Sequence, residues 1–196
     1  MRKGRYILVV LFIFSLTESM SAFANDEEKV DHFLRKNLDA VQVLLKNETL
    51  AKEKKNQQIM SVIREAFDFP KMAKLTLGKR YWPSLTKQQQ TQFSELFVDR
   101  LKASYLEKLS LYTDEKILFE APVRVKKKIH VMTELVSEES KFTMLYKFYK
   151  SKKKGWRIYD VEIEGVSLIT TYRSQFHEVL QTGTIDDLFV KLKKPE

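Results

Sequence analysis

Cysteine is absent from all 196 positions of the chain, and this absence narrows the available chemistry. It excludes disulfide bonds, thiol nucleophiles and cysteine-ligated metal sites. Glycine is scarce as well, with five residues that do not cluster. A phosphate-cradling loop or a dinucleotide fingerprint needs closely spaced glycines, so the sequence contains neither.

The sequence also lacks the common catalytic and metal-binding motifs. His32, His130 and His177 lie far apart, without the H-E-x-x-H spacing of a zinc site. No G-x-S-x-G elbow marks a serine hydrolase. We therefore predict no catalytic residue, no metal and no cofactor. A triad assembled from distant residues, as in a periplasmic hydrolase, stays open as an alternative because such triads are recognised in space.

No apolar run is long enough to span a bilayer, which needs roughly 20 residues. The longest covers 11 residues, Tyr6 to Leu16; Arg2, Lys3 and Arg5 precede it, and Ala22-Phe23-Ala24 follows. This order is typical of a secretory signal peptide with its cleavage site. We predict that residues 1–24 are removed and that 25–196 form one soluble domain; an uncleaved anchor is the alternative.

Acidic residues are outnumbered by basic ones, which gives a net charge of +9. Much of the excess lies in three lysine runs: Lys52, Lys54 and Lys55; Lys126 to Lys128; and Lys152 to Lys154. Such runs are typical of solvated surfaces, although they also attract anionic membranes. Nucleic-acid binding would need basic residues interleaved with stacking aromatics, so together with the export signal we predict no nucleic-acid partner.

Apolar residues at helical spacing predict a helix-rich first half. Asp68, Thr86, Ser167 and Thr184 are the expected N-caps, and Thr86 with Gln89 forms a capping box. The predicted helices are 26–47, 52–66, a short helix from Asp68 to Gly78, 86–109, a helix from Ser167 to Gly183, and a last helix from Thr184.

Alternating apolar residues predict four strands between the long helix and Gly165. One face of the first strand is expected to carry Ile117, Phe119, Ala121, Val123 and Val125, and one face of the fourth Tyr159, Val161 and Ile163. Short turns between the later strands imply antiparallel pairing. The predicted fold is α+β: a curved four-stranded antiparallel sheet packed against several helices on one face.

Two stretches carry a family resemblance. One is G-V-S-L-I-T-T-Y-R-S-Q-F from Gly165 to Phe176, after the strand that starts at Trp156. The other is F-D-F-P-K-M-A-K-L-T-L-G-K-R-Y-W from Phe67 to Trp82, followed by T-K-Q-Q-Q-T-Q-F-S-E-L-F. Both resemble the MlaC / toluene-tolerance family of periplasmic phospholipid-binding proteins, and the likeness covers most of the chain beyond the first helix.

The resemblance implies an apolar lipid cavity between the sheet and the helices. The wall residues that it implies are Leu101, Tyr105, Met144, Tyr146, Val161, Ile163, Val166, Ile169 and Tyr172. Arg173 would lie near the head-group phosphate, with a plain surface arginine as the alternative, and Tyr81 and Trp82 would border the cavity or anchor packing. Without the resemblance, these aromatic stripes would indicate an ordinary core.

The resemblance further implies a carrier in the periplasm, with phospholipid as cargo rather than cofactor. Its partners would be an outer-membrane lipoprotein–porin complex and an inner-membrane ABC transporter with an MCE-type subunit, and its role would be to maintain outer-membrane lipid asymmetry. Two alternatives stay open besides the hydrolase: a carrier of hopanoid-type or other lipids from the same family, and an interaction module without cargo.

Overall fold

The computed structural model describes residues 6–109, 115–137 and 141–194, with side chains described from Asn25 onward except at 107 and 108. The predicted signal peptide therefore falls partly outside the described residues, at 1–5, and is otherwise described in backbone only. Within these ranges, no helix combines the length and the apolar character that crossing a bilayer would need.

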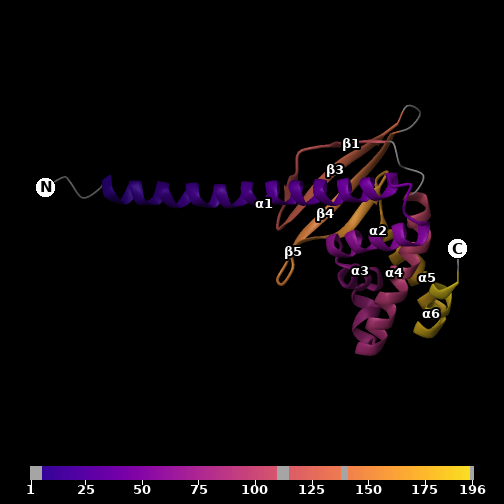
Figure 1. The fold of residues 1–196 in the computed structure, drawn as a ribbon. Helices are drawn as coiled ribbons and strands as arrows, with labels where there is room; N and C mark the ends of the chain where they lie inside the picture. Colours follow the sequence, from indigo (N-terminus) through magenta and orange to yellow (C-terminus); the bar gives the residue numbers. More distant parts are fainter. Residues whose placement is uncertain (1–5, 110–114, 138–140, 195–196) are drawn as a thin grey trace.

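The first helix, α1, spans Tyr6–Lys46 and continues through the predicted cleavage site. Its N-terminal part projects away from the rest of the molecule, and its second half crosses one face of the sheet (Figure 1). Asp26 contacts the sheet, because its carboxylate accepts hydrogen bonds from the Trp156 indole and the Lys150 ammonium, each at 3.1 Å. Val30 and Leu34 on the same helix are buried.

Four of the remaining helices begin where the capping residues predicted them. The Thr86–Gln89 capping box is confirmed, with Gln89 N 3.2 Å from Thr86 Oγ1 and Thr86 N 2.9 Å from Gln89 Oε1. Asp68, Ser167 and Thr184 also accept the expected capping bonds. The helices are α2 Lys52–Ala66, α3 Phe69–Tyr81, the 3-10 turn Trp82–Ser84, α4 Lys87–Leu109, α5 Leu168–Thr182 and α6 Ile185–Lys193.

The junction between α2 and α3 is fastened to the sheet. Asp68 donates its backbone N–H to Ile158 O at 2.9 Å, and its carboxylate accepts the hydroxyl of Tyr149. Lys71, one turn into α3, lies 4.5 Å from the centre of the Tyr149 ring. These contacts join residues distant in sequence, and they fix the direction in which α3 leaves the sheet.

Among the described residues the sheet has six strands, so the predicted number of four is wrong. The strands are β1 Lys116–Phe119, β2 Val123–Val125, β3 Lys128–Val136, β4 Lys141–Ser151, β5 Gly155–Ile163 and β6 Val166–Ser167. They are antiparallel neighbours in the order β1-β3-β4-β5-β6, with β2 also paired to β3. The sheet is open, and α2–α6 lie toward one end of it (Figure 1). The antiparallel pairing of the α+β prediction is confirmed.

Of the two extra strands, β6 follows the turn at Glu164 and Gly165, and the other arises from an interruption that alternation alone does not reveal. The predicted first strand is split into β1 and β2 around Pro122, which lacks the N–H needed for a ladder bond. Phe119 pairs with Thr133 but Val123 pairs with His130, a slip of one residue. A one-residue slip turns side chains to the opposite face, so Val123 is 60% exposed rather than aligned with Phe119.

A bulge changes the face of β5 in the same way. Tyr146 pairs with Val161, whereas Phe148 pairs with Ile158, and the register shifts between them. Both Ile158 and Val161 therefore reach the interior, and Tyr159 does not share their cluster. The Tyr159 ring instead packs edge-on against Tyr149, with centroids 6.0 Å apart. The prediction that Tyr159, Val161 and Ile163 share one face is wrong at Tyr159.

Candidate functional site

The corner between β5 and α5 is built around Asp160. One oxygen of its buried carboxylate accepts the Ser167 hydroxyl at 2.8 Å, and the other accepts the Ile169 backbone N–H at 3.2 Å. Glu164 and Gly165 make the turn with positive φ of 49° and 76°. The strand thereby supplies an anion to the N-terminus of α5, where unsatisfied N–H groups and the helix dipole favour it.

Lys147 on β4 completes the charge balance of this corner. Its ammonium lies 3.2 Å from Asp160 Oδ2 and also pairs with Glu162. Burial alone would lower the pKa of Lys147, but the hydrogen bonds to Glu162 and Asp160 raise it above its ordinary value. The Lys147 ammonium, on the polar face of the sheet, therefore holds the corner between β5 and α5 in one position through Asp160 and Glu162.

The buried apolar side chains of the described residues form two clusters. The sheet cluster lies between the sheet and α1, and it includes Val30, Leu34, Ile129, Phe148 and Ile158. The helical cluster lies among α2–α6, and its members include Met72, Phe93, Phe97, Phe176 and Leu188. Phe67 packs against both. The interior is thus divided into two apolar regions that share a border at the α2–α3 junction.

The predicted wall residues lie on both sides of this division. Four belong to the helical cluster or pack against it: Leu101, Tyr105, Ile169 and Tyr172. Four belong to the sheet cluster or pack against it: Met144, Tyr146, Val161 and Ile163. Val166 on β6 is 60% exposed. Leu168 packs against the sheet cluster and its neighbour Ile169 belongs to the helical one, so the start of α5 lies between the two.

Two tyrosines give this interior a few polar atoms. The Tyr146 hydroxyl lies 3.5 Å from Met144 Sδ, and burial raises the pKa of Tyr146. The Tyr172 hydroxyl lies 3.4 Å from Ser104 Oγ on α4. The Tyr146 phenol therefore stays neutral at physiological pH. The two hydroxyls leave the predicted wall mainly apolar.

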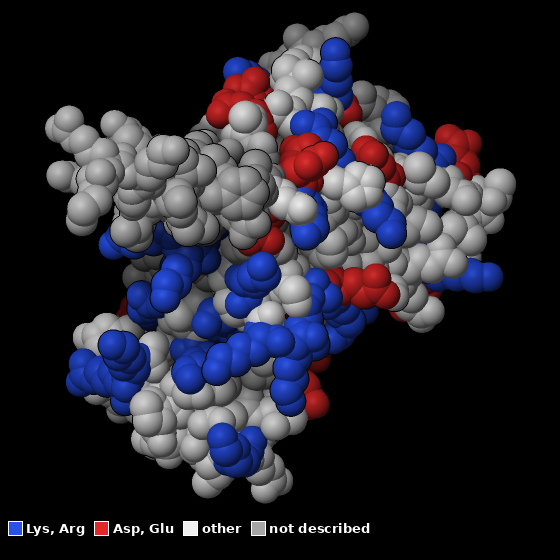
Figure 2. Space-filling view, turned by 90° about the vertical axis from the view of Figure 1, so that its left-hand side faces the viewer, with Lys and Arg blue, Asp and Glu red and all other residues white. Residues whose placement is uncertain are grey.

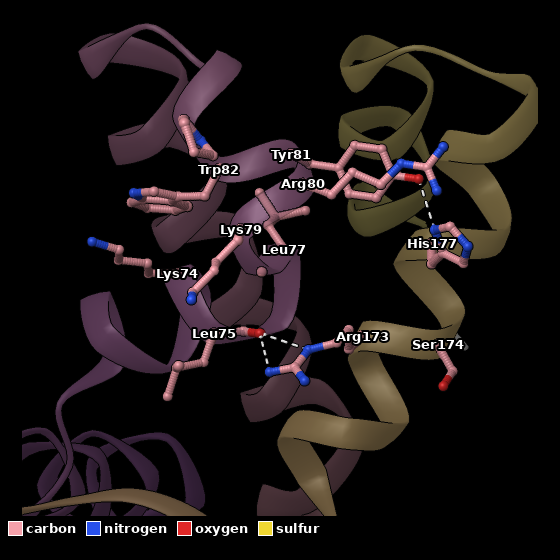
Figure 3. A pocket seen from close by; sticks show the side chains of 12 residues that line it. Lys74, Leu75, Leu77, Lys79, Arg80, Tyr81, Trp82, Arg173, Ser174 and His177 are labelled. Atoms are coloured by element: carbon pink, nitrogen blue, oxygen red, sulfur yellow. Dashed lines mark hydrogen bonds between the residues drawn. The ribbon is translucent and has the colours of Figure 1, made fainter.

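A surface pocket of about 870 Å³ opens where the end of α3 meets α5, and we name it the α3–α5 pocket. Its lining combines basic and aromatic side chains (Figure 3). The lining residues are Lys74, Leu75, Leu77, Gly78, Lys79, Arg80, Tyr81, Trp82, Pro83, Arg173, Ser174 and His177. The signature stretches that carry the family resemblance thus meet here in space.

Hydrogen bonds between the two helices shape this pocket. Arg173 on α5 donates to Leu75 O from Nε at 2.9 Å and from Nη2 at 2.7 Å (Figure 3). Tyr81 Oη lies 2.7 Å from Nδ1 of His177. Gly78, between them, has non-helical φ and ψ of 65° and −170°, which interrupt α3. Arg173 therefore satisfies a carbonyl next to that break, on the surface of the molecule.

Tyr81 and Trp82 line the pocket and pack against the helical cluster from partly buried positions. Trp82 packs edge-on against Phe93, with ring centroids 6.4 Å apart, and remains partly exposed. Arg80 lies over the Tyr81 ring at 5.4 Å. Both rings thus have one packed side and one side toward solvent.

Sequence reasoning missed the Asp160–Lys147 pair and the pocket lysines. An aspartate within the apolar run of β5 was a usable signal for the first, because buried carboxylates are rare unless they are paired. No sequence signal groups Lys74 and Lys79 with Arg173, since α3 and α5 are 90 or so residues apart and meet only in the folded chain.

The fold matches that of a solved α+β protein. That structure is the phospholipid-binding protein from Ralstonia solanacearum in complex with a phospholipid; the TM-score is 0.74 at 22% sequence identity, and the match covers 82% of this chain and 93% of the other. The family model described as MlaC protein matches residues 35–194. The chain therefore belongs to the MlaC family, as the two signature stretches predicted.

Proposed function

We propose that the protein is a periplasmic carrier that encloses the acyl chains of a phospholipid between its sheet cluster and its helical cluster. The observation that carries this proposal is the division of the apolar interior, with predicted wall residues on both sides. Membership of the MlaC family supports it, as does the similar fold of a protein described as a phospholipid-binding protein.

The physical case rests on the cost of exposing hydrocarbon to water. Two acyl chains contain about 30 methylenes, and each contributes about 0.8 kcal/mol when it leaves water. A lipid therefore crosses an aqueous space only inside a dry cavity. Transfer from bilayer to cavity is apolar to apolar and close to balanced, so direction comes from differential affinity for docking partners and not from a chemical step.

The proposal extends to location and partners. Residues 1–24 act as the cleaved signal peptide, and the mature domain begins at Asn25, next to the Asp26 contacts with the sheet. The carrier then moves lipid between an outer-membrane lipoprotein–porin complex and an inner-membrane ABC transporter with an MCE-type subunit. This traffic maintains outer-membrane lipid asymmetry, and the protein itself performs no catalysis.

Mass spectrometry of the intact protein tests the cargo directly. Protein purified from a bacterial periplasm under native conditions should carry bound lipid, and organic extraction should release a diacyl phospholipid. Release of a hopanoid would reassign the cargo. Protein without lipid, together with turnover of an ester substrate, would overturn the carrier function in favour of a hydrolase.

Substitutions in the predicted wall test the location of the cargo. Val161 is 3% exposed and faces Tyr146 across the strand pair, so Val161→Glu should place a carboxylate in the cavity and abolish lipid loading. Met144→Trp, at a partly buried position of the same wall, should block loading by volume without a charge. The exposed Lys153→Glu is the control. Equal lipid loading in all three variants, with circular dichroism showing that each is folded, would mean that these residues do not line the lipid site.

A further inference from the structure

None of the nine predicted wall residues lines the α3–α5 pocket, although Tyr81, Trp82 and Arg173 do, and the charged residues of its lining are all basic. Four of its lining residues are basic: Lys74, Lys79, Arg80 and Arg173. No aspartate or glutamate lines it. Since basic side chains concentrated in a concave surface raise the local concentration of anions, the pocket selects for a negatively charged partner.

The basic side chains of the pocket form no ion pair within the described part of the fold. Lys74, Lys79 and Arg80 are exposed, and none of them pairs with a carboxylate among the residues that the structure describes. Arg173 has two of its five N–H groups on Leu75 O. Figure 2 shows Lys and Arg side chains gathered on one face of the molecule, with few acidic residues between them.

The aromatic residues of the pocket distinguish a bilayer from an acidic protein as the partner. Tyr81, Trp82 and Pro83 contribute to the apolar part of the lining together with Leu75 and Leu77. Trp82 packs against Phe93 and remains partly exposed. Trp and Tyr are the residue types enriched at the head-group level of membranes, and Lys and Arg beside them bind anionic lipid heads. The combination matches a bilayer surface better than charge alone would.

We propose that the α3–α5 pocket is a docking site for the surface of an anionic phospholipid bilayer. The basic side chains contact phosphate groups, while Trp82 and Tyr81 enter the head-group layer. This proposal goes beyond the carrier function and does not depend on it, because docking needs no cargo in the interior.

Vesicle co-sedimentation tests the docking site. The wild type should bind phosphatidylglycerol vesicles at low ionic strength and phosphatidylcholine vesicles weakly, and added salt should weaken the binding. Lys79→Gln with Arg80→Gln should lower the partition coefficient by about tenfold or more, because each basic residue near an anionic surface strengthens binding several-fold. The matched control, Lys152→Gln with Lys153→Gln, removes the same charge from the turn between β4 and β5 and should change it by about twofold or less.

Fluorescence quenching tests the orientation. Vesicles with brominated acyl chains should quench the wild type, and Trp82→Phe, which keeps a ring against Phe93, should remove most of the quenching because Trp156 is buried. Equal losses in the two charge variants, or quenching unchanged in Trp82→Phe, would overturn the proposal. A wild type that does not bind phosphatidylglycerol vesicles but binds an acidic protein would also overturn the proposal. Bound lipid extracted from each variant reports on cargo separately, so loss of docking with cargo retained is distinguishable from failure of the carrier function.

Discussion

Asp160 Oδ1 accepts the backbone N–H of Ile169 at 3.2 Å, and this bond ties the middle of β5 to the first turn of α5. The second oxygen accepts Ser167 Oγ and faces Lys147. Ile169 belongs to the helical cluster, whereas Val161, next to Asp160 in sequence, belongs to the sheet cluster. One carboxylate therefore sets the spacing between the two apolar regions that the proposed cargo would occupy.

Replacing this carboxylate should be among the most destabilising single changes in the chain. Asp160→Ala leaves Lys147 with one acidic partner and leaves the Ile169 N–H without its acceptor, so we expect a loss of about 3 kcal/mol in the free energy of unfolding. Urea denaturation measures the change. Ser167→Ala, which removes the capping hydroxyl but keeps the carboxylate, should cost about 1 kcal/mol. A loss at Asp160 no larger than at Ser167 would contradict the structural role.

Gly78 should not tolerate a side chain, because of its backbone rather than for lack of space. Its φ of 65° and ψ of −170° belong to a region used almost only by glycine, while an added Cβ would lie an acceptable 3.8 Å from Arg173 Nε. Gly78→Ala should therefore cost about 1–3 kcal/mol of stability. Gly155→Ala is a comparison in a surface turn. Gly155 also has a positive φ, and a Cβ added there would have no atom within 4 Å. A neutral Gly78→Ala would mean that α3 can continue through this point.

His130 should make the fold sensitive to mild acid. Burial lowers the pKa of His130 below its ordinary value of 6.5, and the charges of Lys147 and Lys128 lower it further, against Glu162 and Asp160. The unfolded chain then binds the proton more readily than the folded chain. The free energy of unfolding therefore has its full value above about pH 6.5 and decreases as the pH falls below about 6.5.

Denaturation midpoints measured at pH values above and below the usual pKa range of histidine test this effect. His130→Gln should flatten the pH dependence, whereas His32→Gln, at an exposed position on α1, should leave it unchanged. An unchanged slope in His130→Gln would assign the acid sensitivity to other groups.

Asp26 should contribute stability at the junction of the predicted leader and the domain. Desolvation opposes its ionisation, but the hydrogen bonds from Trp156 and Lys150 outweigh it and lower the pKa of Asp26 below 3.8. This contribution is present at neutral pH and lost as the pH falls through the lowered value. Asp26→Ala should cost about 1–2 kcal/mol in urea denaturation at neutral pH. Asp39→Ala, exposed on the same helix, should stay within about 0.5 kcal/mol.

Local chemistry made most element boundaries predictable. Asp68, Thr86, Ser167 and Thr184 each cap the helix that they were expected to cap, because a capping side chain bonds to backbone N–H groups only a few residues away. The predicted faces of the first and last of the four strands failed for the opposite reason. Pro122 and the β4–β5 bulge change which face a side chain occupies, and alternation in the sequence continues across both without a visible break.

The proposed site, like the strand faces, could be predicted from the sequence only in part. The wall residues and Arg173 came from the family resemblance, and only the fold distributes the wall over two clusters and directs Arg173 to the carbonyl of Leu75. The α3–α5 pocket had no signal in the sequence, because its two halves approach through long-range packing.

By itself, the sequence determined the starts of the four capped helices, the antiparallel α+β class and the family, since each depends on residues a few positions apart or on contiguous stretches. Tertiary structure alone decided the register, the Asp160 anchor and the basic pocket. Those features depend on contacts between segments such as β4 with β5 and α3 with α5, whose partners are chosen by packing of the whole chain.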